Sequence, residues 1–370
     1  MYHTDPGIPG VPYIAMRTLT SLLLLSLAAF APQAQPAEYP PVAEVRSAFL
    51  KQLDRPKVPA DRVVVDTKVD GNFVIEQFTI ATEKKRSGKL ERLPVLLVRP
   101  QRPGWKHPAV VVMHGTGGNK ESQRGWLQDL AKNGIIGIAI DARYHGQRAE
   151  GEKGASRYVQ AITEAWKAPV DEMEHPFYYD TVWDLWRLAD YLETRDDIDP
   201  KRLGMIGFSM GGIQTWLAAS VDERWKCSVP AIGVQSFRWS LVNDKWQGRA
   251  RTIAGAHETA AKDLGEPEVN QKVCRALWSK VIPGILEQFD CPSMLRLFAG
   301  RALLIPNGDQ DPNCPIEGAR IAFASAEAAY KAAGCPEKLK IMVAEGVGHK
   351  VTAEQNAAAL EWFIRWLKKE

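Results

Sequence analysis

The sequence predicts an α/β protein in which helices cover both faces of a mostly parallel central sheet. Short, wholly apolar runs such as AVVVM at residues 109–113 and IIGIAI at 135–140 are typical of strands buried on both faces. Segments with apolar residues at helical spacing, such as 182–192, lie between runs of this kind. Strands that alternate with helices form βαβ units, which place their strands in parallel.

The elements follow this alternation along most of the chain. We expect one short helix within residues 36–59, and then three strands rich in Val, Ile and Phe. Residues 38–92 are expected to form an N-terminal extension. The expected strands are 62–69, 73–81, 92–99, 109–113, 135–140, 202–208, 227–232, 302–306 and 339–344. The expected helices are 42–53, 123–133, 182–192, 211–220, 316–333 and 353–369.

Two long stretches interrupt the alternation, and both are too long for plain connections. Residues 149–176 have little apolar periodicity, whereas 236–300 contain several Trp and Arg residues and expected helices. The second stretch starts at the carboxyl edge of the sheet, where open α/β sheets carry their ligand sites, so we expect it to form a partial cap. The main domain, with this cap inserted at about 236–300, then covers 93–370.

The composition is that of a globular protein, with 45% hydrophobic and 25% charged residues in a chain of 370. The formal net charge of +3 gives no electrostatic reason to expect nucleic acid as a partner. The five cysteines form no C-x-x-C motif and the chain has no H-E-x-x-H motif. These patterns predict neither a structural zinc site nor a thioredoxin-like redox motif, and we expect no metal and no other cofactor.

The N-terminus predicts a targeting segment rather than part of the fold. Residues 18–30 are an apolar run of signal-peptide length, Arg17 precedes it, and small residues follow. We expect residues 1–37 to be a signal peptide and its upstream residues, cleaved after Ala31, Ala34 or Ala37. The mature protein would then be periplasmic or secreted, with no stable membrane insertion; an uncleaved anchor is the alternative. Export would permit disulfides, with at least one cysteine left over and the pairing open.

The motif GFSMG at 207–211 predicts a nucleophile at Ser209. A G-x-S-x-G sequence between a buried strand and a helix start is where the nucleophile elbow of a serine hydrolase lies. The flanking glycines suit a tight turn and a close approach of helix to strand. The alternative is a serine that caps a helix after a glycine turn.

The motif HGTGGNK at 114–120 directly follows the strand 109–113. It is not a phosphate-binding loop, because Asn119 and Glu121 stand where that motif requires Gly and Ser or Thr. Glycines after a buried strand leave backbone N–H groups free to bind an anion. We therefore expect an oxyanion hole made by the N–H of Thr116 or Gly117 together with that of Met210, with His114 holding the loop.

An acid and a base are expected after the last two strands. Asp309 and Asp311 both follow the strand 302–306, and turn chemistry alone would explain either of them. In the chain order Ser…Asp…His the base must follow the acid, and of the seven histidines only His349 does.

Together these residues resemble the α/β-hydrolase superfamily, and within it the dienelactone hydrolase-like, prolyl-oligopeptidase-like and acetyl xylan esterase-like serine esterases. The resemblance rests on DPKRLGMIGFSMGG at 199–212 and DARYHGQR at 141–148, and it covers about 93–369. It assigns the acid to Asp311, because the family pattern G-x-x-D-x-x-[VC]-P fits Gly308, Asp311 and Pro315. Dienelactone hydrolases use a Cys nucleophile, whereas Ser209 favours ordinary ester hydrolysis.

The resemblance implies a Ser-His-Asp esterase that works through an acyl-enzyme on a small-molecule or carbohydrate ester. Within the cap, Phe237, Arg238, Trp239 and Trp246 are candidate substrate-binding residues, and a capped pocket favours short acyl chains. A secreted prolyl-oligopeptidase-like peptidase and a non-catalytic binding module on a hydrolase fold are the alternatives.

Overall fold

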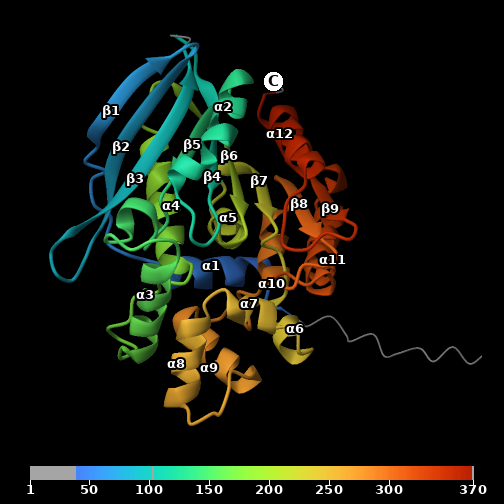
Figure 1. Ribbon diagram of the computed structural model, residues 1–370. Helices are drawn as coiled ribbons and strands as arrows, with labels where there is room; N and C mark the ends of the chain where they lie inside the picture. The colour runs from blue at the N-terminus through green and yellow to red at the C-terminus, as the bar shows by residue number, and fades with distance from the viewer. Residues whose placement is uncertain (1–38, 102–103, 369–370) are drawn as a thin grey trace, which may run out of the picture. The chain divides into compact units, whose positions relative to one another are not determined.

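The computed structural model describes residues 39–101 and 104–368. Nine strands form one sheet in the order β1-β2-β3-β5-β4-β6-β7-β8-β9 (Figure 1). The strands are β1 (Val63–Asp70), β2 (Phe73–Lys84), β3 (Leu90–Pro100), β4 (His107–Met113), β5 (Ile136–Ile140), β6 (Ile198–Phe208), β7 (Trp225–Ala231), β8 (Ala302–Gly308) and β9 (Leu339–Ala344). All nine match strands expected from the sequence.

The sheet is antiparallel at one end and parallel over the rest. β1, β2, β3 and β5 pair antiparallel, whereas the strands from β5 through β4 to β9 pair in parallel. β4 and β5 are buried at every residue because helices cover both faces of the sheet, and apart from His107 at the start of β4 their side chains are apolar. This is the α/β-hydrolase fold, preceded by the expected N-terminal strand extension.

Helices cover both faces of the sheet (Figure 1). One hydrophobic core unites α2 (Arg124–Lys132) and α12 (Ala353–Leu367) with the sheet. The core on the other face includes α1 (Val42–Gln52), α4 (Tyr179–Leu192), α5 (Met210–Val221) and α11 (Ile316–Ala332). This arrangement leaves the carboxyl ends of the parallel strands free for loops.

The two long stretches are largely helical. The first contains α3 (Ser156–Lys167), which the sequence analysis did not expect. The second forms α6 (Phe237–Val242), α7 (Gln247–Arg251), α8 (Ala254–Asp263), α9 (Gln271–Val281) and α10 (Cys291–Met294). Helix α3 lies against α8, where a Cβ added to Gly255 would come within 3.3 Å of Val159 (Figure 1).

The expected signal peptide lies outside the described residues. Within 39–101 and 104–368, no helix is both long enough and apolar enough to cross a membrane. All five cysteines are buried free thiols, so the structure pairs none of them.

Candidate active site

Ser209 lies in a strained turn between β6 and α5. Its backbone has φ 56° and ψ −113°, a conformation that residues other than glycine rarely adopt. The turn also brings helix and strand very close, since a Cβ on Gly211 would lie 2.6 Å from the carbonyl oxygen of His114. The flanking glycines of the motif are therefore required by packing. The turn places Ser209, half-buried, at the N-terminus of α5.

The structure brings Ser209, His349 and Asp311 into one hydrogen-bonded chain. His349 Nε2 lies 2.7 Å from Ser209 Oγ, and His349 Nδ1 lies 2.7 Å from Asp311 Oδ2. A carboxylate can only accept, so Nδ1 carries the proton and Nε2 is free to accept the proton of the Ser209 hydroxyl. Asp311 is 3% exposed, whereas the side chain of His349 is 22% exposed. The acid is thus enclosed and the base opens toward solvent.

The loop after β8 orients Asp311 rather than Asp309 toward the histidine. Asp311 Oδ1 accepts the backbone N–H groups of Asn313 at 2.8 Å and Cys314 at 3.0 Å, which leaves Oδ2 for His349. The backbone N–H of Asp309 instead donates to the carbonyl of Ala344 at the end of β9. Of the two acids that the sequence left open, Asp311 is therefore the one bonded to the histidine.

The acid loop and the histidine loop are tied together by α12. The side chain of Gln355 donates to the carbonyl of Asn307 on β8 and to that of Met342 on β9, each at 3.0 Å. The backbone N–H of Gln310 donates to Val347 at 3.0 Å. These bonds fix the spacing of the two loops that carry Asp311 and His349.

The glycine loop after β4 passes beside the serine. A Cβ on Gly115 would lie 3.6 Å from the Cβ of Ser209. The backbone N–H groups of Thr116, Gly117 and Met210 have no acceptor among the described residues. Unpaired N–H groups at a helix start and in a glycine loop can bind a developing oxyanion.

His114 holds this loop in place. Its ring is fully buried, with Nε2 accepting the N–H of Ala142 at 3.1 Å and Nδ1 donating to the carbonyl of Gly115 at 2.7 Å. Burial lowers the pKa of His114, so the ring is neutral at pH 7. The buried ion pair between Lys120 Nζ and Asp141 Oδ2, at 2.9 Å, joins the same loop to the loop after β5.

The four candidate substrate-binding residues of the cap do not form one surface. Phe237 is fully buried, with its ring against Trp278 at 5.6 Å between centroids, so the expectation that it contacts substrate is wrong. Its aromatic partners come from distant segments, which the local sequence does not reveal. Trp246 is 9% exposed, Trp239 is half-buried on α6, and Arg238 is exposed. None of the four side chains hydrogen-bonds to the triad within the described part of the chain.

Arg249 is a buried residue of the site that the sequence analysis did not identify. It lies on α7, is 2% exposed, and donates to the carbonyl of Asn313 at 3.0 Å and to Cys314 Sγ at 3.1 Å. The same helix touches the acid loop at Gly248, where a Cβ would overlap the carbonyl of Pro312. A lone arginine in an insertion carries no sequence signal for this role, because the role depends on packing against a loop about sixty residues away.

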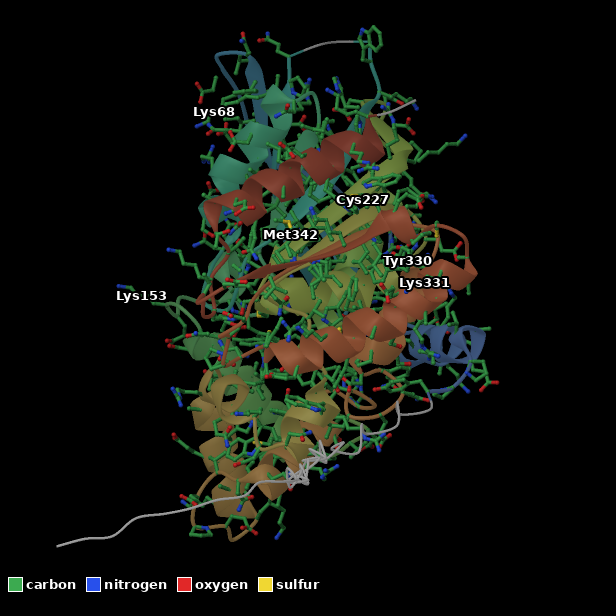
Figure 2. The ribbon with its side chains drawn as sticks, turned by 90° about the vertical axis from the view of Figure 1, so that its right-hand side faces the viewer. Lys68, Lys153, Cys227, Tyr330, Lys331 and Met342 are labelled. Atoms are coloured by element: carbon green, nitrogen blue, oxygen red, sulfur yellow. The ribbon has the colours of Figure 1, made fainter. Side chains whose placement is uncertain are left out.

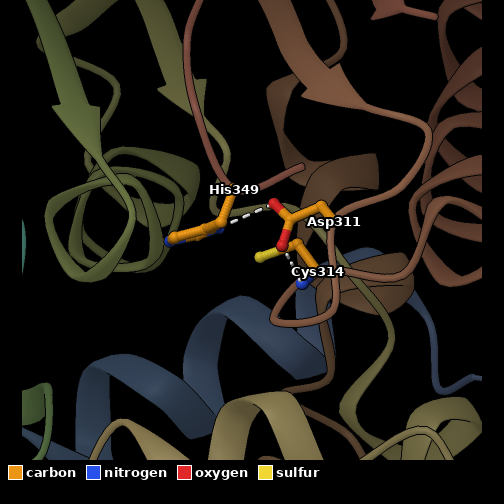
Figure 3. Close-up of side chains that lie close together, drawn as sticks. All are labelled: Asp311, Cys314 and His349. Carbon is orange, nitrogen blue, oxygen red and sulfur yellow. Dashed lines mark hydrogen bonds and ion pairs between the residues drawn. The ribbon is translucent and has the colours of Figure 1, made fainter. Parts of the chain in front are cut away.

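Asp311, Cys314 and His349 together offer three atoms of metal-ligating type within 4.8 Å of one another (Figure 3). Two features disfavour the binding of a metal cation at this cluster. Burial raises the pKa of the Cys314 thiol to about 12, and the guanidinium of Arg249 lies against its sulfur. Since a thiol must lose its proton to bind a metal, we assign no metal to this cluster.

Comparison with known proteins finds a family match over part of the chain. Residues 93–262 match the model of the dienelactone hydrolase family. The curated protein named "Putative hydrolase YtaP", from Bacillus subtilis (strain 168), is 25% identical over 290 residues, which are 75% of this chain and 84% of that protein.

Solved structures of similar fold cover most of the chain. An acetyl xylan esterase from Paenibacillus sp. R4 superposes with a TM-score of 0.60 at 20% identity, over 88% of this chain and 93% of that one. Acetyl xylan esterase 1 from Thermoanaerobacterium sp. JW/SL YS485 gives 0.63 at 17% identity, with the same two coverages. The chain therefore matches the dienelactone hydrolase family model over residues 93–262, has an α/β-hydrolase fold, and is a hydrolase that acts on esters.

Proposed function

We propose that this protein hydrolyses carboxylic esters of short acyl chains by a Ser-His-Asp mechanism with an acyl-enzyme intermediate. The observation that carries the proposal is the hydrogen-bonded chain from Ser209 through His349 to Asp311, with 2.7 Å at each step. Its nucleophile occupies the strained turn at the start of α5. Turn, base and acid come from three separate loops that meet at the carboxyl edge of the sheet.

Acylation begins when Ser209 Oγ attacks the ester carbonyl while His349 Nε2 takes its proton. Asp311 keeps the imidazole in the required tautomer and stabilises the imidazolium that forms. The tetrahedral intermediate carries a negative oxygen, which the N–H of Met210 and that of Thr116 or Gly117 bind. Such a donor contributes about 3–4 kcal/mol to the transition state in comparable sites.

The intermediate then expels the alcohol, to which the imidazolium returns the proton. Water attacks the acyl-enzyme, with His349 again accepting a proton, and releases the acid and free Ser209. A fluorophosphonate probe tests this scheme, because it labels only an activated serine. We expect one adduct per chain by intact mass and none in Ser209→Ala, whereas an adduct that persists in that variant would refute the assignment.

Acetyl esters, including those on carbohydrates, are the substrates we propose. The names of the acetyl xylan esterase neighbours support this choice. A cap above the site favours small acyl groups over long lipids. A p-nitrophenyl series together with acetylated xylan tests it, with activity expected from acetyl to butyryl and little at about ten carbons or more. Preference for long acyl chains would exclude a capped pocket, and cleavage of peptides but not esters would identify a peptidase.

Trp239 and Trp246 are the cap residues that we propose contact the substrate, with Arg238 meeting an acidic or hydroxyl-rich group. Trp239→Ala and Trp246→Ala should raise KM more than they lower kcat. Trp366→Ala is the matched control, because that residue is half-buried on the distant helix α12. If neither cap substitution moves KM beyond the control, these residues do not bind substrate.

We also propose that the protein is exported and that residues 1–37 are removed. The order of Arg17, the apolar run 18–30 and the small residues supports this. N-terminal sequencing of the periplasmic or secreted protein should give a start near residue 35 or 38. A cytosolic protein that begins at Met1 or Met16 would contradict export.

A further inference from the structure

Strand β1 exposes apolar side chains along the edge of the sheet. All eight of its residues are exposed, and Val63, Val64, Val65 and Val69 are 48–61% exposed. They are four of the eleven exposed large hydrophobic side chains in the described part of the chain. No other strand there gathers so many, which makes β1 an apolar edge of the kind that another strand can cover.

Among the described residues, no strand lies on the outer side of β1. The sheet ends at β1, which pairs with β2 alone, so half of its backbone N–H and C=O groups face solvent. Such an edge can accept a strand of another chain. A register shift between Val64 and Asp66 and the exposed charge of Lys68, at the margin of the molecule in Figure 2, restrict which strand can fit.

The sequence of β1, VVVDTKVD, is complementary to itself in one antiparallel register. If Thr67 lies opposite Thr67 of a second copy, Asp66 faces Lys68 of that copy, and Lys68 faces its Asp66. Val65 then faces Val69 of the second copy, and Val69 faces its Val65. The pairs that flank Thr67 in this register are thus either oppositely charged or apolar, and both kinds stabilise antiparallel strands, whereas Val64 faces Asp70 of the second copy.

Neighbouring symmetric registers lack this match. Centring the pair on Lys68 would oppose two lysines on the axis, and centring it on Asp66 would oppose two aspartates. A parallel, in-register pair would also place like charges side by side. Because directly opposed like charges are destabilising, the charges select one closed register and disfavour open-ended stacking.

We propose that β1 is a homodimer interface, in which two copies pair antiparallel about a two-fold axis at Thr67. The nine-stranded sheet would then continue across the dimer. The candidate active site stays open, because Ser209 follows β6 and His349 follows β9, at the opposite edge of the sheet (Figure 1). Ester hydrolysis by each copy is therefore independent of the pairing.

A cross-link tests the register. Opposed residues of antiparallel strands have Cα atoms about 4.5–5.5 Å apart, within the range that a disulfide spans. Thr67→Cys should therefore form a covalent dimer under mild oxidation. The five native cysteines are all buried and give no background. Asp70→Cys is the matched control on the same strand, since it would face Val64 rather than itself. Equal or greater cross-linking in the control would overturn the register.

Charge exchange tests the interface itself. Sedimentation of the purified protein over a range of concentrations should give a monomer–dimer equilibrium. Lys68→Asp should raise the dimer Kd by about tenfold or more, because it opposes Asp66 with a second aspartate on both sides of the axis. Asp66→Lys with Lys68→Asp restores the pairs and should restore the dimer, while kcat/KM stays unchanged in both. A monomer at all concentrations, or a dimer insensitive to Lys68→Asp, would refute the proposal.

Discussion

Lys120 binds Asp141 through two of its own atoms. Its backbone N–H donates to Asp141 Oδ1 at 2.8 Å, and its side-chain ammonium lies 2.9 Å from Oδ2. Asp141 is fully buried and Lys120 is 4% exposed, and the carboxylate also accepts the N–H of Gln147 at 3.1 Å. One aspartate after β5 thus fixes the end of the glycine loop that passes Ser209.

Removal of the Lys120 side-chain charge should lower the free energy of unfolding. Lys120→Met leaves the carboxylate of Asp141 buried without its counter-charge, and breaking such a pair costs about 3–5 kcal/mol. Urea unfolding followed by circular dichroism measures the loss. Lys132→Met is the control, because Lys132 pairs with Asp129 at the surface and should change stability by less than about 1 kcal/mol. Equal effects of the two substitutions would show that the buried pair does not hold the loop.

Substitution of the two acids after β8 should have very different effects on kcat. Asp311→Asn should lower kcat by about 10⁴-fold, because an amide at this place favours the wrong tautomer of His349. Asp309→Asn should cost far less, since Asp309 makes no hydrogen bond to His349. Steady-state kinetics on p-nitrophenyl acetate compares them, and a reversed ranking would move the acid to Asp309.

Arg249 should act on kcat through the position of Asp311. Arg249→Met removes the donor to Asn313 and Cys314, which frees the loop that carries the acid. We expect kcat to fall by about 10–100-fold with little change in KM, because small displacements of a catalytic group are costly. Arg251→Met is the control, since Arg251 is exposed on the same helix. A change confined to the melting temperature would make Arg249 a structural residue only.

Acid should destabilise the protein through buried histidines. Burial lowers the pKa of His257 to about 4, where its Nε2 accepts from Trp278 at 3.0 Å. In the unfolded chain the same histidine takes up its proton near pH 6.5. As pH falls from 6.5 to 4 the unfolded state gains a proton that the folded state refuses, so stability declines by about 3 kcal/mol over that window and is unaffected above it. His257→Gln should flatten the pH dependence of unfolding free energy there, and an unchanged slope would contradict the assignment.

The strands and the loops that carry the triad could be predicted because each leaves a local signal. Buried strands are continuous apolar runs, and the serine turn needs its glycines. Helix α3 leaves such a signal too, since its buried residues Tyr158, Ala161, Ile162 and Ala165 recur at helical spacing, so the prediction that 149–176 has little apolar periodicity was wrong for this segment.

Features that depend on packing between distant segments could not be predicted. Phe237 looks like a free aromatic residue in the sequence, yet Trp278 encloses it. Arg249 gains its role only when α7 reaches the acid loop. Nothing near either residue in the sequence specifies its partner, and only the folded insertion brings the partners together.

His349 follows β9, which pairs with β8 alone among the described strands and is half-exposed along most of its length. An edge strand opens locally at a lower free energy than the centre of a sheet. Each such opening moves His349 away from Ser209 while β4 to β7 stay folded. The rate of turnover therefore follows the local unfolding of this edge of the sheet and not the unfolding of the whole protein. Enzyme activity should consequently be lost at a lower urea concentration than the one at which the fluorescence of the buried Trp216 and Trp225 changes.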